Sequence, residues 1–407
     1  MGRAGRTGPG VTRRQPDPYH WPNGEAFYRI LYYSNKAIAA GCRDPEIHLL
    51  KSRSQMKLGI HPAAAEKDVL KYYPAMQRSG YPPCLKAYDL IAALHAAAAV
   101  KPPWPGAARK VMLTKLQRLF PAILAEKGLP GPDVVELMAR YEGLYKTLYG
   151  ARAPALRRMI VLINKARPLR SVCWDVKGIS YINYAWDARG FSPAVPPDRL
   201  ILFVKRLAVA RAALQHAYGI NPRDYMAATL MIMVDMGLGR KIPDMNRWFH
   251  RAIDANPDDF LAYSKKKRFL YRRWGGSRHQ LLRFARQCAA NHGYAGGVRF
   301  MACLIYNHVA AYNGAALNPY TGNAFFKHAR RWKRIDALFT NYLRRFPHDY
   351  YHRWWLAQYA AWCGHWRIAR QQIALCGKHL RPRIFGLKNN AAMLREFVKT
   401  VNAHVKK

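Results

Sequence analysis

The sequence is poor in acidic residues, with 23 Asp and Glu against 67 Lys and Arg, a formal net charge of +44 in 407 residues. The shortage is greatest in residues 261–407, which hold 28 basic residues and three acids, against 39 and 20 in residues 1–260. A surface with so few acids repels itself unless an anion neutralises it. The imbalance predicts a polyanionic partner, either a nucleic acid, with RNA favoured, or an acidic protein.

Long apolar runs and paired cysteines are also missing. No segment approaches the roughly 18 apolar residues of a membrane-spanning helix, and the N-terminal stretch MGRAGRTGPGVTRRQPDP lacks the apolar core of a secretory signal. The seven cysteines are scattered singly without a CxxC pair, which argues against a disulfide framework or a zinc module. We therefore expect a cytoplasmic protein that does not bind membranes, with residues 1–24 as a flexible basic tail.

Catalytic and cofactor motifs are absent as well. The sequence contains no GxxxxGKS or GxxxxGKT, no HExxH, no GxSxG, and no GxGxxG that follows a strand. The histidines are single, apart from His348 and His352 on either side of Asp349. Carboxylates are too few to assign as general acid and base. We expect no enzymatic activity, metal, cofactor or small-molecule substrate, and a catalytic pocket between helices stays open as an alternative.

Helical patterns fill the chain from residue 25 onward. Residues 25–40 carry apolar side chains at helical spacing and stop at Gly41, and Asp44 with Pro45 is typical of an N-cap and a first helical position. Similar proline and glycine punctuation separates further stretches of helical length. No stretch alternates apolar and polar residues over the length of a strand, which predicts an all-α fold.

The second half of the sequence repeats a two-helix pattern. NPRD at 221–224, NPDD at 256–259 and FPHD at 346–349 each precede a helical stretch that ends in glycine, followed by a second helix. A period near 34 of two antiparallel helices is typical of tetratricopeptide repeats (TPRs). The sequence thus predicts an α-solenoid of TPR-like hairpins. Its expected parts are an N-terminal helical region (25–170), repeats (171–309), an inserted loop (310–326) and strongly basic repeats (327–407).

Three stretches resemble the signature segments of a bacterial TPR-like family of unknown function. They are SYINYAWDARG (180–190), MNRWFHRAIDANP (245–257) and FLYRRWGGS (269–277). The resemblance covers roughly residues 175–290 and implies a helical repeat fold without an assigned activity. The strong basic charge departs from the family pattern and is particular to this chain.

Two groups of residues are predicted to form turns. In WGGS, Trp274 is expected to fold back on its helix pair, Gly275 and Gly276 to adopt unusual backbone angles, and Ser277 to cap the next helix. Gly364 is expected to let two helices approach closely. We also expect Asp258 to be an N-cap, and Asp187 to pair with Arg189 or with an arginine of a neighbouring repeat.

The candidate nucleic-acid contacts are cations that no nearby acid offsets. In KKKRFLYRR (265–273) and the residues just before it, Ala262, Tyr263, Phe269 and Leu270 are expected to face inward and the cations to spread over the other faces. Stacking of the repeats would bring the cations to one concave surface that follows a phosphate backbone without reading its sequence. The predicted residues are Lys265, Lys266, Lys267, Arg268, Arg272, Arg273, Lys327, Arg330, Arg331, Arg334, Arg353, Arg367 and Arg370. The alternative is a scaffold for protein–protein interaction.

Overall fold

The computed structural model of the protein describes residues 24–58, 60–126, 131–165, 170–190, 192, 194–291, 295–312, 317–377 and 391–405. Within these ranges the chain forms eighteen α-helices, two short 3-10 helices and one isolated β-bridge. The helices of the first half are α1 (Gly24–Ala39), α2 (Pro45–Leu58), α3 (Pro62–Arg78), α4 (Pro83–Ala99), α5 (Gly106–Ala125), α6 (Gly131–Tyr149), α7 (Ala153–Lys165), α8 (Ser171–Arg189) and α9 (Pro197–Ile220). Those of the second half are α10 (Tyr225–Gly237), α11 (Ile242–Ala255), α12 (Phe260–Phe269), η1 (Arg272–Trp274), α13 (Arg278–Ala289), η2 (Ala295–Phe300), α14 (Met301–Ala311), α15 (Ala329–Arg345), α16 (Tyr350–Cys363), α17 (Trp366–Cys376) and α18 (Ala391–Val405).

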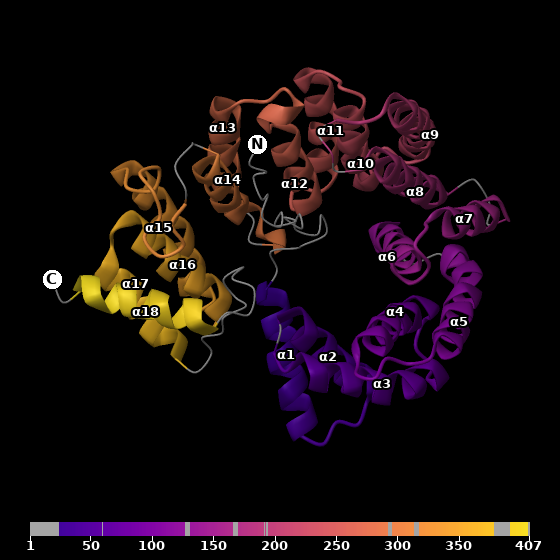
Figure 1. Ribbon diagram of the computed structural model, residues 1–407, viewed down its shortest axis with the longest axis horizontal. Coiled ribbons are helices and arrows are strands. Elements are labelled where there is room, and N and C mark those ends of the chain that lie inside the picture. Colours follow the sequence, from indigo (N-terminus) through magenta and orange to yellow (C-terminus); the bar gives the residue numbers. More distant parts are fainter. Residues whose placement is uncertain are drawn as a thin grey trace, which may run out of the picture.

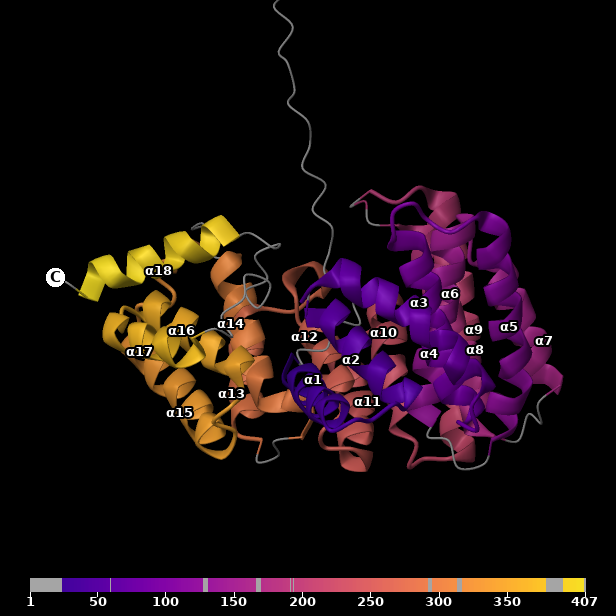
Figure 2. The same ribbon diagram turned by 90° about the horizontal axis from the view of Figure 1, so that it is seen from below.

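The helices follow one another around a ring (Figure 1). Consecutive helices pack side by side, for example α3 with α4, α10 with α11, and α16 with α17. In Figure 1, α4, α6 and α12 lie on the inner side of the ring, and α3, α5 and α9 lie on the outer side. Helix α1 contacts α16, which closes the ring, and α18 packs on α17 at the C-terminal end (Figure 2). The predicted all-α, TPR-like array of helical hairpins is confirmed.

Among the residues that the structure describes, buried side chains form three core clusters in chain order, and α10 joins the first two. Leu230, Met231 and Val234 of this helix belong to the N-terminal cluster, whereas Ile232 and Met236 belong to the next one. A helix that is apolar on all sides must be buried on all sides. This explains why the segment YMAATLMIMVDMG has no polar face in the sequence.

Aspartates of the three repeated tetrapeptides cap the helices that follow them. Asp224, Asp259 and Asp349 are the N-caps of α10, α12 and α16, and each carboxylate accepts a hydrogen bond of 3.0 Å from a backbone N–H two or three residues further on. The expectation for Asp258 is wrong, because the turn places the second aspartate of NPDD at the cap. Asp44 behaves as expected and accepts from the amide of Glu46 at 2.8 Å.

The WGGS turn has the expected backbone. Gly275 has φ +86°, in the left-handed region, and a Cβ on Gly276 would overlap the carbonyl of Leu270. Ser277 caps α13 by accepting a hydrogen bond of 3.2 Å from the amide of Gln280. The ring of Trp274 lies against Trp186 of α8, edge to face, with 5.6 Å between the ring centroids. The turn therefore also connects two of the three family-like stretches in space.

The expectation that Gly364 lets two helices approach closely is wrong. This glycine ends α16 with φ +88° and is exposed, and an added Cβ would meet no atom within 4 Å. The position requires glycine because of its left-handed backbone angle and not because two helices meet there.

The segment expected as an inserted loop begins inside α14, which continues to Ala311, and its described part is packed against α16. The indole N–H of Trp362 donates to the carbonyl of Pro319 at 3.0 Å, and Phe325 and Phe326 are buried in the second core cluster. Residues 313–316 of this segment, and residues 1–23 of the expected tail, lie outside the described residues. Among the described helices, none has the length and apolar character needed to cross a membrane.

Candidate functional site

The predicted cationic cluster of α12 is largely built into the core. Lys265 is 4% exposed and Lys266 7% exposed, so the expectation that these side chains face solvent is wrong. The ammonium of Lys266 lies 3.9 Å from the ring centroid of Phe249 and 4.9 Å from that of Phe284. Burial lowers the pKa of Lys266 to about 8, and it does the same for Lys267. The charge of Lys266 is held against two aromatic faces and is not presented to a partner.

The cations that follow on α12 and η1 gather around two indoles. The guanidinium carbon of Arg268 lies 5.5 Å from the centroid of Trp186, and that of Arg273 lies 4.9 Å from the centroid of Trp274. Arg189 lies 5.7 and 5.5 Å from the same two rings. Burial, with smaller contributions from the neighbouring arginines, lowers the pKa of Arg268. Arg268 is half-buried, whereas Arg273 and the preceding Arg272 are exposed.

Asp187 pairs with a neighbouring element and not with Arg189. Its carboxylate lies 2.6 Å from the ammonium of Lys146 and 2.8 Å from the Nε of Arg152. The second of the two expected partners, an arginine from an adjacent part of the array, is therefore the observed one. Arg189 contacts the indoles described above instead.

The cations at the start of α15 are accessible. Lys327, Arg330 and Arg334 are exposed, and Arg331 is half-buried. The guanidinium carbon of Arg331 lies 3.3 Å from the ring centroid of Phe325, and its Nη1 donates to the Phe325 carbonyl. These contacts hold Arg331 in one place, so its remaining N–H groups are pre-oriented for an acceptor.

A cavity of about 240 Å³ lies where α13, α14 and α15 meet. Its lining side chains come from both sides of the inserted segment, and we call the cavity the arginine pocket. They are Leu282, Arg286, Tyr306, His328, Arg330, Arg331 and Arg334. The structure thus brings three predicted residues together and adds Arg286, Tyr306 and His328. The sequence carries no signal for these three, because they lie on separate elements that only the packing joins.

The arginine pocket is strongly electropositive. No carboxylate lines it, and Asp336, the next acid along α15, accepts a hydrogen bond from Thr340. Burial lowers the pKa of Arg331, and the charges of Arg278 and Arg334 add to this effect. Like charges three or four residues apart on a helix cost roughly 0.2–0.5 kcal/mol per pair. An anion in the pocket would relieve this repulsion.

The N-terminal end of α15 adds to the positive potential. His328 is its N-cap and gives no side-chain hydrogen bond to the first turn, and this turn contains no acid. A helix N-terminus carries the equivalent of roughly half a positive charge and presents backbone N–H groups to an anion. The N-terminal end of α15 and the arginines of the pocket therefore both favour an anionic ligand.

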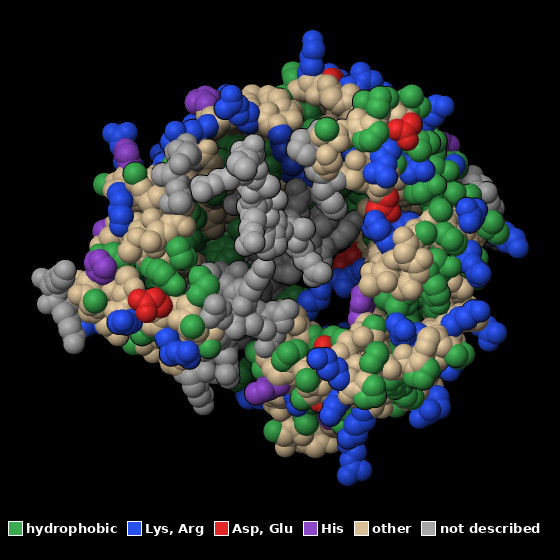
Figure 3. Space-filling view, in the orientation of Figure 1, with side chains coloured by type: hydrophobic (Ala, Val, Ile, Leu, Met, Phe, Trp, Pro, Cys, Tyr) green, Lys and Arg blue, Asp and Glu red, His purple; other side chains and the backbone are tan. Residues whose placement is uncertain are grey.

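The remaining predicted cations lie on α16 and α17 and do not line the pocket. Arg353 is half-buried and donates to the Gln372 side chain at 2.7 Å and the Pro347 carbonyl at 2.8 Å. Arg367 and Arg370 are exposed. On the face shown in Figure 3, Lys and Arg side chains are spread around the whole rim, with few Asp and Glu side chains. The predicted residues therefore form separate groups, and the expectation that stacking brings all of them to one concave surface is wrong.

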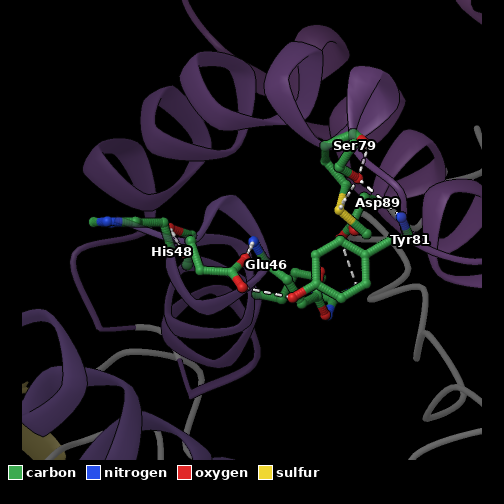
Figure 4. Close-up of polar contacts among 9 residues, drawn as sticks. Glu46, His48, Ser79, Tyr81 and Asp89 are labelled. Carbon is green, nitrogen blue, oxygen red and sulfur yellow. Dashed lines mark hydrogen bonds and ion pairs between the residues drawn. The ribbon is translucent and has the colours of Figure 1, made fainter. Parts of the chain in front are cut away.

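Acidic side chains meet in the N-terminal helices, in the region shown in Figure 4. The guanidinium of Arg53 lies 2.7 Å from Glu46 and 2.7 Å from the fully buried Asp89, whose pKa is raised by burial to about 8. The Tyr81 hydroxyl donates to Asp44 at 2.6 Å. These contacts join α2, the turn before α4, and α4, so we assign them to stability. In the described ranges, no group of three or more His, Cys, Asp or Glu side chains is arranged to hold a metal ion.

Comparison with known proteins adds little to this geometry. No family model matches the chain, and no curated protein matches it. Among solved structures, a monomeric mutant of IFIT1 with m7Gppp-AAAA aligns with 88% of this chain and 76% of its own, at 11% identity and a TM-score of 0.31. The two chains share too little for a residue or a ligand to be carried from one to the other.

Proposed function

We propose that the protein is a non-catalytic, cytoplasmic TPR-like adaptor that binds RNA through its phosphate groups, without sequence specificity. The observation that supports this most is the arginine pocket, in which four guanidiniums and no carboxylate surround one cavity. Phosphate contacts dominate the affinity of nucleic-acid-binding proteins and need such groups. Membership in the bacterial TPR-like family remains part of the proposal and rests on the sequence resemblance of residues 180–190, 245–257 and 269–277.

The lining of the pocket supports binding through phosphates, because four of its seven side chains are arginines. Tyr306 is 2% exposed, so its ring is covered, and the other ring of the lining is the exposed imidazole of His328. Recognition of single-stranded bases requires aromatic or planar groups on which bases stack, or polar groups that reach their edges. The pocket offers guanidiniums, which match phosphate geometry.

The proposal is tested by the salt dependence of RNA binding. We expect the logarithm of the affinity for a short single-stranded RNA to fall linearly with the logarithm of the salt concentration. Replacing Arg286 and Arg334 together by Gln should lower the affinity and reduce the slope by about 0.7 for each phosphate that the variant no longer neutralises. The matched control is the pair Arg344→Gln and Arg395→Gln, which removes the same charge from two exposed positions outside the pocket.

The control separates local binding from general attraction. Equal effects of the two double variants would show that only net charge matters and would remove the pocket from the proposal. The alternative is a scaffold that binds an acidic or peptide segment of another protein. Undetectable RNA binding, together with capture of a peptide partner that responds weakly to salt, would favour this alternative.

A further inference from the structure

The size of the arginine pocket limits what it can enclose. Its volume of about 240 Å³ lies below the range of roughly 300–1,000 Å³ that is usual for pockets enclosing a drug-sized molecule. A whole nucleotide, with base and sugar, would therefore not be enclosed. A phosphate group with the adjoining part of a sugar is the portion of an RNA strand that matches a cavity of this size.

The number of donors in the pocket exceeds what an internal phosphate can accept. Each guanidinium carries five N–H groups and can bond two oxygens side by side. Arg331 uses one donor on the Phe325 carbonyl, and Arg334 bonds the phenol of Tyr306, which leaves most of the donors available. An internal phosphodiester offers two non-bridging oxygens and one charge. A terminal phosphate monoester offers three oxygens and close to two charges at neutral pH.

The cations reach the cavity from two sides. Arg286 comes from α13, whereas Arg330, Arg331 and Arg334 come from the first turns of α15, beside His328. A group that enters the cavity with its end can contact both sides at once. A strand that passes over the opening presents its phosphates to the exposed side chains only.

We infer that the arginine pocket binds the terminal phosphate monoester of an RNA strand in preference to an internal phosphodiester. This inference rests on the proposed function and adds the chemical class of the group that the site holds. The chemistry is the same at a 5′ end and a 3′ end, so the experiment distinguishes the two.

The test uses the full chain and one short RNA sequence in three forms, with a 5′-phosphate, with a 3′-phosphate, or with hydroxyls at both ends. Since hydrogen bonds to charged groups are the stronger ones, we expect one phosphorylated form to bind about tenfold tighter or more than the hydroxyl form. Inorganic pyrophosphate should compete for this extra affinity. Arg334→Gln should abolish the preference, and Arg344→Gln should retain it.

Arg334 also bonds Tyr306, so Arg286→Gln serves as a second variant whose side chain is exposed on α13. Circular dichroism of both variants checks that the helices are intact. Equal affinity for the three RNA forms, with binding still weakened by these variants, would overturn the inference and leave the proposed function standing. Tight binding of a phosphoserine peptide without binding of any RNA form would overturn both.

Discussion

Replacing Lys266 by methionine should stabilise the protein at neutral pH. The ammonium of Lys266 is buried between Phe249 and Phe284, at 3.9 and 4.9 Å from the ring centroids, and the side chain is 7% exposed. Methionine has a similar length, carries no charge and packs well against aromatic rings. The substitution therefore removes the cost of a buried charge and keeps most of the packing.

The expected gain follows from the lowered pKa. Burial lowers the pKa of Lys266 from 10.5 to about 8, and each unit corresponds to about 1.4 kcal/mol, so holding the charged form in the folded protein costs about 3 kcal/mol. Lys266→Met should thus raise the free energy of unfolding by about 3 kcal/mol at pH 7.

The pH dependence distinguishes this cause from a simple packing effect. Below pH 8 the amine is charged in both the folded and the unfolded protein, so the full cost is present. Between pH 8 and 10.5 the folded protein loses the proton while the unfolded chain keeps it, so the natural protein gains stability as the pH rises. The advantage of Lys266→Met should therefore shrink over this interval.

Urea unfolding followed by tryptophan fluorescence at pH 7 and pH 10 measures the effect. Lys333→Met, at an exposed position of α15, is the matched control and should change stability little at either pH. If Lys266→Met lowers stability to the same extent at both pH values, the ammonium is a favourable partner in the folded protein. The assignment of the α12 lysines to the core would then be wrong.

Two further predictions concern a turn and a buried acid. Gly364→Ala should lower the free energy of unfolding by about 1–2 kcal/mol, because the cost lies in the left-handed backbone and the surrounding space is open. Gly364→Val should cost somewhat more, since a β-branched side chain tolerates this backbone least. Unfolding or aggregation of the valine variant alone, in thermal melts, would restore the close helix contact. Burial raises the pKa of the 1% exposed Glu142 to about 7. Between about pH 4.5 and 7 the unfolded chain loses this proton while the folded protein keeps it, so the free energy of unfolding falls as the pH rises. The free energy of unfolding of Glu142→Gln, relative to that of the natural protein, should therefore be higher at pH 8 than at pH 5 in urea unfolding. The same difference in unfolding free energy at both pH values would contradict the raised pKa.

Local sequence signals predicted the helical hairpins well. The aspartates at the start of α10, α12 and α16, the glycines of the WGGS turn and the cap at Ser277 each act within a few residues along the chain. Backbone hydrogen bonds of caps and the angles open to glycine do not depend on distant packing. Such features can therefore be predicted from a single sequence. The N-cap of α12 was predicted one residue too early, at Asp258 instead of Asp259.

The candidate site was predictable only in part. The spacing of Arg330, Arg331 and Arg334 on one helix identified them as candidate contacts, and they line the pocket. The cations at 265–268 were also predicted to be accessible contacts, although two of them are buried. A lysine in a helical pattern is expected at the surface, and yet Lys265 and Lys266 are buried because α12 packs among α10, α11 and α14. Long lysine side chains can place their methylene stems in a core, which residue type alone does not reveal.

The all-α class, the hairpin repeat and the excess of positive charge follow from the amino-acid order alone, because periodicity, capping and composition are properties of short segments. Packing in three dimensions selects which cations are covered by aromatic rings and which surround a cavity. Arg286 and Arg334 are 48 positions apart in the chain, and only the packing of α13, α14 and α15 around the inserted segment places them on one pocket. Contacts between separate hairpins depend on how each buries its apolar face, and no local pattern encodes that arrangement.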